Sequence, residues 1–535
     1  MNNKQLLIHK IFYDYFLQNY IIDKVGKITD EELLTRIKDL ALFAYLHHTG
    51  YFVDARIESI IANYGLGLES LACKENLAEI KYVNYDNAIY YIASKFYEVG
   101  GHTRVISEVV ASLDSYKQQV LILTEQKFEA IPKWFVDENS NRLEIICLED
   151  IIPEKFSSFD KAFLLRALTK SAYKIILSTN PEDFLPVLAL SYENCPVVLF
   201  ENHAHSWFWF GRSISDLVFS HTAFHVGITK KYREIDNNYL LKVKFDNKNA
   251  QFEFKDKLLA KQRLAIPEGK ICITTIGTVM KFYPLSKQYN IFRLIQELLE
   301  KFENVYIVVV GLNADLKEIN EFHLDGERVR FVGYQTDLTD YYLSSDICID
   351  SIPEPSLGAT VLAARIGLSC PLFKYGSAEI FDATNLFPNN LYSNYIGKLK
   401  NKVEFIEKLG FLILNEKIRN QIALEYKQCF LEDCNDELIM KNTIEMIKYS
   451  DSLIHEVKMN QSTVWHNDDN TIDLANSSAI SIDSAIRSNL RYFKLVDLIS
   501  IFFILFRQRG FKLYSIKALF HLVIKKRVLK QLFNV

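Results

Sequence analysis

The sequence predicts an α/β protein in which two parallel sheets are accompanied by a helical N-terminal domain and a basic helical C-terminal tail. Short β-rich runs alternate with helical stretches, and this texture occurs twice along the chain. A chain of 535 residues, 49% of them hydrophobic, is also too long for one ordinary core. Strands that alternate with helices form parallel sheets covered on both faces, so we expect two Rossmann-like domains.

The chain divides into six expected parts. Residues 1–85 show helical periodicity without strand-like alternation and predict a helical N-terminal domain of no legible role. The later parts are the first Rossmann-like domain at 86–241, a linker at 242–265, the second Rossmann-like domain with closing helices at 266–450, a polar linker at 451–485 and the tail at 486–535. The expected strands are 88–96, 119–123, 173–178, 196–200, 271–276, 305–310, 329–332 and 347–352.

Composition excludes several classes of protein. The net charge of −4 offers no general attraction to nucleic acid, and the eight scattered cysteines are typical of reduced thiols in a cytoplasmic protein. No CxxC pair is present, so we expect no zinc site. The N-terminal apolar stretch is too short for a signal peptide, and no apolar run reaches the roughly 18 residues that cross a bilayer. We expect a cytoplasmic protein without a cofactor.

The first candidate motif joins the expected strand 88–96 to a helix. It contains Gly100, Gly101, His102 and Arg104. Paired glycines allow a sharp turn and close approach of a ligand, and the amides of a helix start favour negative charge. We expect a phosphate or a sugar there rather than an ordinary strand-to-helix turn.

The second motif places His203 and His205 after the expected strand 196–200. An imidazole at the carboxyl end of a strand can bind a sugar hydroxyl or move a proton near neutral pH. Histidines packed at a domain surface are an equally weighted alternative for either residue. A metal site with the downstream histidines lacks a completing carboxylate or cysteine pattern.

The third motif opens the second Rossmann-like domain with Gly277, Thr278 and Lys281. A lysine just beyond a strand and a glycine turn can neutralise a diphosphate leaving group. The alternative is a solvated loop cation, and the position on the first loop of the domain favours function.

The fourth motif follows the expected strand 347–352 and contains Glu354, Gly358 and Thr360. Two prolines end the strand, and an alanine-rich helix begins whose first turn can receive phosphate oxygens. Glu354 would lie in the cleft between the domains, where open α/β sheets bind ligands. A carboxylate that only caps the helix is the structural alternative.

Taken in order, these segments resemble the GT-B glycosyltransferases over about residues 88–450. The glycine-rich loop at 100–104 is similar to the acceptor-side loop of family 4 glycosyltransferases, where a histidine like His203 or His205 lies near the transferred sugar. Gly277 and Lys281 are similar to the donor-phosphate element of that family, and 354–358 to the start of its donor signature. Ala363 departs from the resemblance, because the family has a ribose-binding glutamate there.

A second GT-B branch is also similar, the O-GlcNAc transferases and the bacterial cytoplasmic N-glucosyltransferases. The resemblance rests on Lys281, Thr360, the stretch 367–379 and the helical N-terminal domain, and it implies that the lysine contacts the donor diphosphate. The two branches differ in stereochemical outcome, so retention and inversion both stay open. The sequence contains no Asp-x-Asp triad, which is consistent with GT-B enzymes and predicts metal independence.

The tail at 486–535 carries eleven basic residues and one acidic residue between apolar positions. Basic helices with apolar faces lie in membrane interfaces, so we favour contact with an anionic membrane surface over a hairpin docked on the acidic body. The leading hypothesis is therefore a cytoplasmic glycosyltransferase, peripheral at the inner leaflet, that passes a sugar from a nucleotide-sugar to a glycan or lipid-linked acceptor of the capsule or lipopolysaccharide type. Protein glycosylation and a non-catalytic nucleotide-sugar-binding scaffold are the alternatives.

Overall fold

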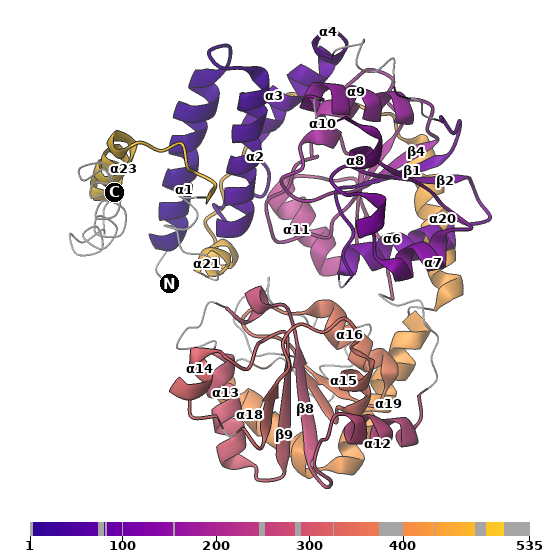
Figure 1. Ribbon diagram of the computed structural model, residues 1–535, viewed down its shortest axis with the longest axis vertical. Coiled ribbons are helices and arrows are strands. Elements are labelled where there is room, and N and C mark those ends of the chain that lie inside the picture. The colour runs from indigo at the N-terminus through magenta and orange to yellow at the C-terminus, as the bar shows by residue number, and fades with distance from the viewer. Residues whose placement is uncertain are drawn as a thin grey trace.

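The protein has two lobes (Figure 1). The computed structural model describes residues 4–72, 80, 83–98, 100–153, 156–244, 252–283, 290–324, 326–373, 399, 401–433, 435–476 and 488–507. One lobe contains the N-terminal helices and the first α/β domain, and the other contains the second α/β domain. Parts of several predictions lie outside the described residues, among them 374–379 of the N-glucosyltransferase-like stretch, 477–485 of the expected polar linker, and 486–487 and 508–535 of the tail.

The first α/β domain contains a parallel sheet with the strand order β3-β2-β1-β4-β5-β6-β7. Its strands are β1 (Ile89–Ala93), β2 (Gln119–Leu123), β3 (Glu144–Cys147), β4 (Lys174–Ser178), β5 (Val198–Glu201), β6 (Leu217–Ser220) and β7 (Asn238–Leu240). Its helices are α6 (Gly101–Ser112), α7 (Lys133–Asn139), α8 (Leu148–Ile151), α9 (Ser158–Thr169), α10 (Leu185–Leu190) and α11 (Ala223–Arg233). The winding reverses between β1 and β4, and sheets of this kind bind ligands at the carboxyl ends of the strands near such a point.

The second α/β domain contains a parallel sheet with the strand order β10-β9-β8-β11-β12. Its strands are β8 (Ile271–Ile276), β9 (Val305–Val310), β10 (Val329–Phe331), β11 (Ile347–Ile349) and β12 (Cys370–Leu372). Its helices are α12 (Phe254–Arg263), α13 (Ile291–Lys301), α14 (Lys317–Glu321), α15 (Thr339–Ser344), α16 (Leu357–Ile366), α18 (Lys402–Leu414) and α19 (Glu416–Asp433). The prediction of two Rossmann-like domains is confirmed.

The N-terminal helices share one apolar core with the first sheet. They are α1 (Lys4–Phe16), α2 (Asp30–His47), α3 (Ala55–Leu66) and α4 (Leu68–Leu71). Phe12 of α1 and Ile61 of α3 are buried in the same cluster as Val198 of β5. The buried carboxylate of Glu58 accepts hydrogen bonds from the backbone N–H groups of Gly211 at 3.0 Å and Ser213 at 2.7 Å. The helical region is therefore an extension of the first lobe and has no separate core.

The chain returns to the first lobe after α19. Helix α20 (Asp436–Tyr449) packs against α6, and its Met446 and Ile447 are buried in the core on that side of the first sheet. The last helix of the range 266–450 therefore packs with the first domain, although the sequence pattern groups it with the second.

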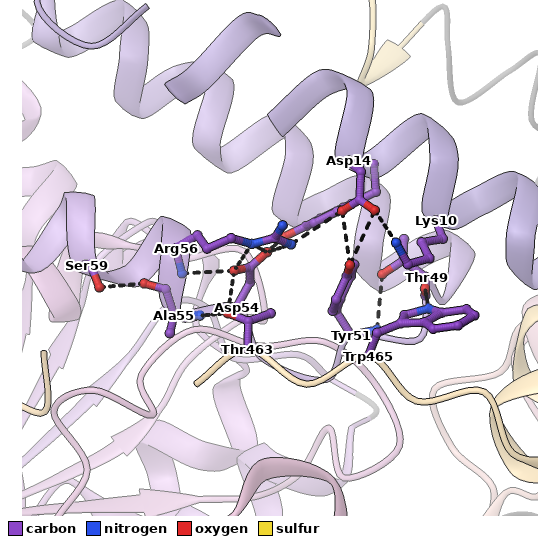
Figure 2. Close-up of polar contacts among 11 residues, drawn as sticks. Lys10, Asp14, Thr49, Tyr51, Asp54, Ala55, Arg56, Ser59, Thr463 and Trp465 are labelled. Atoms are coloured by element: carbon purple, nitrogen blue, oxygen red, sulfur yellow. Dashed lines mark hydrogen bonds and ion pairs between the residues drawn. The ribbon is translucent and has the colours of Figure 1, made fainter. Parts of the chain in front are cut away.

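Residues 453–476, which we name the C-terminal strap, run along the first lobe instead of forming a loose linker. The N–H of Lys458 donates to Ser213 O at 2.8 Å, and the N–H of His466 donates to Gly50 O at 2.9 Å. Figure 2 shows the central contacts, where Trp465 Nε1 donates to Thr49 O at 3.0 Å and Thr463 Oγ1 donates to Asp54 at 3.0 Å. The strap ends in helix α21 (Asp469–Asn476), which packs on α1.

Gly50 is a point where the strap approaches the helical region closely. Its φ is +85°, and a Cβ there would lie 2.4 Å from Trp465 Nε1. We expect Gly50→Ala to lower the free energy of unfolding by about 2 kcal/mol, because the alanine would be strained at this φ and its Cβ would be overpacked. Urea denaturation checks this value. Gly26→Ala is the control, because Gly26 has a φ of +69° but open space around its Cβ position; equal losses in both variants would contradict the argument.

The described part of the tail is docked on the N-terminal helices. Helix α23 (Leu495–Arg507) packs against α1, and Leu498 and Ile501 are buried in the shared core. The carboxylate of Asp497 accepts hydrogen bonds from the hydroxyls of Tyr15 and Tyr20. The opposite side of α23 exposes apolar side chains, namely Val496, Ile499, Phe503 and Ile504. Among the described helices, none has both the length and the apolar character needed to cross a membrane.

Candidate functional site

The residues predicted from the four motifs lie at the carboxyl ends of strands in both sheets. His102 is in the first turn of α6 after β1, and His203 and His205 follow β5. Lys281 lies in the short helix η4 (Val279–Phe282) after β8, and Glu354 follows β11. Helices α6 and α16 lie on the sides of the two lobes that face each other (Figure 1). We refer to His102, His203, His205, Lys281 and Glu354 together as the interlobe site.

A buried carboxylate orients the histidine that follows β5. Glu201 is fully buried and contacts His203 Nδ1 at 3.0 Å and His221 Nε2 at 2.9 Å, while Ser178 Oγ donates to it at 2.7 Å. Burial alone would raise the pKa of Glu201, but the two imidazoles hold it well below its usual range. Burial would likewise lower the pKa of His203, and the adjacent Glu201 carboxylate outweighs that effect and raises it. His203 is thus a histidine held in one orientation and made more basic.

His102 packs beside this pair. Its ring centroid lies 5.2 Å from that of His203, and its Nε2 is 3.0 Å from Lys95 O. Burial, with a contribution from His203, lowers the pKa of His102 to about 4, so its imidazole is neutral at physiological pH. An uncharged imidazole at this position can hydrogen-bond a sugar hydroxyl.

The other residues of the glycine-rich motif differ in part from their expected roles. The guanidinium of Arg104 lies 4.2 Å from the centre of the Trp134 ring, which fixes it in a cation–π contact. Gly100 has a φ of −176°, an extended conformation that any residue adopts. The backbone conformation of Gly100 therefore does not require glycine, and its contact with a ligand stays a prediction. Gly101 begins α6, whose first amides point out of the helix.

His205 is packed against a second histidine. Its ring centroid is 3.5 Å from that of His225, and burial lowers its pKa to about 3, with contributions from Arg233 and Lys281. Burial also holds the pKa of His225 well below its usual range. The described residues contain no group of three or more histidine, cysteine or carboxylate side chains that could hold a metal ion. His205 therefore matches the packed alternative more closely than His203 does.

The two motifs of the second domain are joined to each other. Lys281 Nζ donates to Pro355 O at 2.9 Å, and Lys281 O accepts from the backbone N–H of Glu354 at 3.2 Å. Gly277 makes room for this junction, because a Cβ there would lie 3.0 Å from that of Ser351. The segments after β8 and β11 thus form one compact unit around the lysine.

The start of α16 follows directly on this unit. Thr360 lies in its first turn, and its Oγ1 is buried without a hydrogen-bond partner in the described part of the chain. A buried hydroxyl of this kind is available to a ligand oxygen. Thr278 is exposed beside η4, and Gly358 lies where a Cβ would meet nothing within 4 Å. Ala363 is fully buried in an apolar cluster with Cys272 and Val308, so the side chain at this position packs into the core.

Charges of the two lobes act on each other at the interlobe site. Lys281 of the second domain contributes to the lowered pKa of His205 in the first domain. Burial raises the pKa of Tyr45 in α2 to about 12, and Glu354 of the second domain contributes to that rise. The predicted phosphate-binding residues and the predicted sugar-binding residues therefore lie within electrostatic range of one another.

Sequence reasoning missed the partners of His203 and the contribution of α2. Glu201 is the last residue of β5 and His221 follows β6, and the strand β6 was not among the expected strands. In the sequence, a carboxylate two positions before a histidine is only a weak sign of their pairing. The contact of Glu201 with His221 cannot be read locally, because it depends on the pairing of β5 with β6. Tyr45 does not belong to any recognisable sequence motif.

This chain is similar to known proteins in its structure and not in its sequence. No protein-family model and no curated protein sequence matches the chain. The chain is similar to a solved glycosyltransferase from Rickettsia africae, with 14% identity, a TM-score of 0.50, and coverage of 69% of this chain and 100% of the other. It is also similar to the O-GlcNAc transferase of Thermobaculum terrenum (10% identity, TM-score 0.47, 78% and 79% coverage). A third similar structure is the UDP-GlcNAc 2-epimerase of Neisseria meningitidis (13% identity, TM-score 0.43, 67% and 100% coverage).

The fold follows from the sheets and the first comparison together. Each lobe contains a parallel sheet with Rossmann-like strand order, and the two motif-bearing edges lie within electrostatic range of each other. The match to the Rickettsia glycosyltransferase extends over the whole of that chain. This protein has the GT-B fold of glycosyltransferases, with an N-terminal helical extension fused to its first lobe.

Proposed function

We propose that the protein is a glycosyltransferase that moves a sugar from a nucleotide-diphosphate-sugar to a surface glycan of the capsule or lipopolysaccharide type. The observation that carries this proposal is the position of Lys281 beside the start of α16 and in electrostatic range of the first-lobe histidine His205. A cation and a helix start suit a diphosphate, and neutral or oriented imidazoles suit sugar hydroxyls. The glycosyltransferase in the first comparison supports the same class of reaction.

The donor diphosphate would bind to the second domain. Lys281 would neutralise the charge that develops on the leaving diphosphate, and the buried hydroxyl of Thr360 would donate a hydrogen bond to one of its oxygens. Gly277, Thr278 and Gly358 would let the phosphates approach the backbone, and Glu354 would bind sugar hydroxyls. Because Ala363 packs into the core, any contact with the nucleotide ribose must come from another residue.

The acceptor hydroxyl would react beside His203. The bond between the anomeric carbon and the diphosphate oxygen breaks, a bond from the same carbon to the acceptor oxygen forms, and the nucleotide diphosphate leaves with the electron pair. The acceptor proton passes to His203, which Glu201 orients and makes more basic. No step in this scheme requires a metal ion, since Lys281 and the helix start supply the positive potential.

Rates of donor hydrolysis and of sugar transfer, measured for a panel of nucleotide-sugars, test the proposal. We expect the purified protein to release nucleotide diphosphate from at least one of UDP-glucose, UDP-N-acetylglucosamine and GDP-mannose, at the same rate with and without EDTA. Product nucleotide is measured by chromatography. Complete loss of turnover in EDTA would contradict metal independence. Nucleotide-sugar binding without turnover would favour the scaffold alternative, and epimerised sugar without transfer would place the protein in another reaction class.

The chemical nature of the acceptor distinguishes glycan synthesis from protein glycosylation. Intact-mass and glycan analysis of host cells with and without the protein separates the two, since protein glycosylation adds hexose or hexosamine mass to a polypeptide. We favour the glycan, because the tail suggests a membrane-bound acceptor. A lipid-linked glycan is assembled at the inner leaflet, where a basic peripheral enzyme would meet it.

We also propose that α23 and the basic residues that follow it hold the protein at an anionic membrane. Val496 and Phe503 are exposed to 62% and 54% on the side of α23 away from α1, and each basic residue near anionic lipid contributes about 1 kcal/mol. Burial of these apolar side chains in the lipid interface would add to that attraction.

Removal of residues 508–535 is expected to move the protein from vesicles that contain anionic phospholipid into the supernatant of a sedimentation assay. Phe503→Ser is expected to weaken binding by about tenfold. Deletion from residue 486 is a poorer test, because Leu498 and Ile501 belong to the shared core. Ile454→Ser is the control, because Ile454 is an exposed apolar residue of the strap. Unchanged sedimentation of both tail variants would contradict membrane contact.

A further inference from the structure

Helix α2 of the N-terminal region presents two residues to the interlobe site. Thr29 caps the start of the helix, and the buried side chains of Leu34 and Ile37 place it in the shared core. Lys38 and Tyr45 are seven residues apart, so they lie on one side of the helix, two turns from each other. Both are only partly buried.

Lys38 reaches the carboxyl edge of the first sheet. Its Nζ forms an ion pair with Glu125, which follows β2, and Glu125 also lies 3.8 Å from Nζ of Lys95, which follows β1. The next carboxylate along this edge, Asp183, is buried and accepts from the hydroxyls of Ser94 and Thr124. Helix α2 is therefore attached to the edge at which parallel sheets bind their ligands.

Tyr45 lies two helical turns further on and faces groups from both lobes. Its ring centroid is 5.9 Å from that of Trp207, which follows β5, in an edge-to-face arrangement. The charges of Glu354 in the second lobe and Glu182 in the first both add to the rise in the pKa of Tyr45. Within the described part of the chain the Tyr45 hydroxyl has no hydrogen-bond partner. The hydroxyl of Tyr64 in α3 differs in this respect, because it donates to Asp30.

We propose that α2 forms one wall of the acceptor site and that Tyr45 selects an uncharged sugar as the acceptor. This inference rests on the proposed glycosyl transfer and assigns a role to the N-terminal helical region. The aromatic rings of Tyr45 and Trp207 provide a surface for the apolar face of a sugar ring, and the Tyr45 hydroxyl and Glu182 provide hydrogen-bonding groups for its hydroxyls.

The charges around Tyr45 favour a neutral acceptor over a phosphorylated one. The negative charges of Glu182 and Glu354 both act on the phenol, whereas the ammonium group of Lys38 is engaged by Glu125. A phosphate or uronate at this position would meet two carboxylates, and repulsion between like charges in a partly buried site weakens binding. The diphosphate of the donor meets Lys281 instead, so the two substrates are separated by charge.

The test measures donor and acceptor steps separately. The donor step is hydrolysis of the donor found active in the panel, and the acceptor step is transfer to p-nitrophenyl β-glucoside, p-nitrophenyl N-acetyl-β-glucosaminide and glucose 6-phosphate. We expect Tyr45→Ala to raise the KM for the neutral glycosides about tenfold and Tyr45→Phe about threefold, with the donor KM unchanged. We expect glucose 6-phosphate to be a poor acceptor for the wild type. Tyr116→Phe is the matched control, because Tyr116 precedes β2 at the opposite end of the sheet.

The outcomes distinguish this inference from the proposed function. A wild type that neither binds nor hydrolyses any donor overturns the proposed transfer and this inference with it. Normal donor hydrolysis with an unchanged acceptor KM in both Tyr45 variants overturns only the role of α2. Donor hydrolysis without saturable transfer to either neutral glycoside, or preferred transfer to glucose 6-phosphate, overturns the assignment of a neutral acceptor.

Discussion

Replacement of Lys281 by alanine is expected to lower the rate of sugar transfer by about 100-fold or more, and to weaken binding of the free nucleotide diphosphate. Removal of one preorganised group that stabilises developing negative charge costs about this much in other enzymes. The loss should appear in kcat as well as in the donor KM, because the charge on the diphosphate grows as its bond to the sugar breaks. Initial rates at varied donor concentration, with calorimetry for the diphosphate, measure both effects.

The lysine also holds the segment after β11, so its structural role needs a control. Lys281→Arg keeps a cation and is expected to recover part of the rate, whereas loss of the Pro355 contact alone would affect both variants alike. Lys270→Ala is a matched substitution at the other end of β8, where the lysine contacts Glu303 O, and it should leave transfer unchanged. Equal rates for Lys281→Ala and the wild type, with equal melting temperatures, would remove the cation from the mechanism.

Replacement of Glu201 by glutamine is expected to shift the pH dependence of transfer to lower pH. His203 must be neutral to accept a proton, so activity rises as pH increases through its pKa. Glu201 raises that pKa in the wild type, and without its charge the burial of His203 lowers it. The acid limb of the pH–rate profile therefore moves to lower pH. The maximal rate falls about tenfold or more, because the imidazole is a weaker base. His203→Ala should lose the limb altogether.

A second buried carboxylate–histidine pair provides the control for this experiment. Asp216 contacts His455 Nδ1 at 2.9 Å where the C-terminal strap meets the first domain. Asp216→Asn removes a similar buried charge and should lower stability without moving the acid limb. A profile for Glu201→Gln that coincides with that of the wild type would exclude His203 as the proton acceptor.

Most strands of the two sheets were predictable from their apolar runs. β2, β8 and β9 begin and end where those runs do, because strands buried on both faces are largely apolar. The edge strand β10 was predicted as well, whereas the interior strand β6 was missed. β3 and β7 are short edge strands with partly exposed side chains, and β12 contains Pro371, which cannot donate to a ladder. Their pairing depends on neighbours distant in the sequence, so no local pattern indicates them.

The candidate site was predictable where its residues follow a strand in a recognisable motif. Lys281 and Glu354 were assigned to one site because both follow central strands, and their backbone hydrogen bond is the physical counterpart of that assignment. Tyr45 was not predictable, since its position depends on how α2 packs on the first sheet. The docking of the strap was not predictable either, because its contacts with the first lobe are polar ones, such as those of Thr463 with Asp54 and of Trp465 with Thr49 O, and they leave no hydrophobic periodicity.

The return of α20 to the first lobe has a mechanical consequence. The chain leaves the first domain after Lys244 and comes back at Asp436, and the side chains of these two residues form an ion pair. Two chain crossings that lie next to each other form a hinge. A hinge permits the lobes to rotate about that point and resists their sliding or separation. Under the proposed function, the edges that bind donor and acceptor would separate to exchange substrates and return to the same alignment for the next transfer.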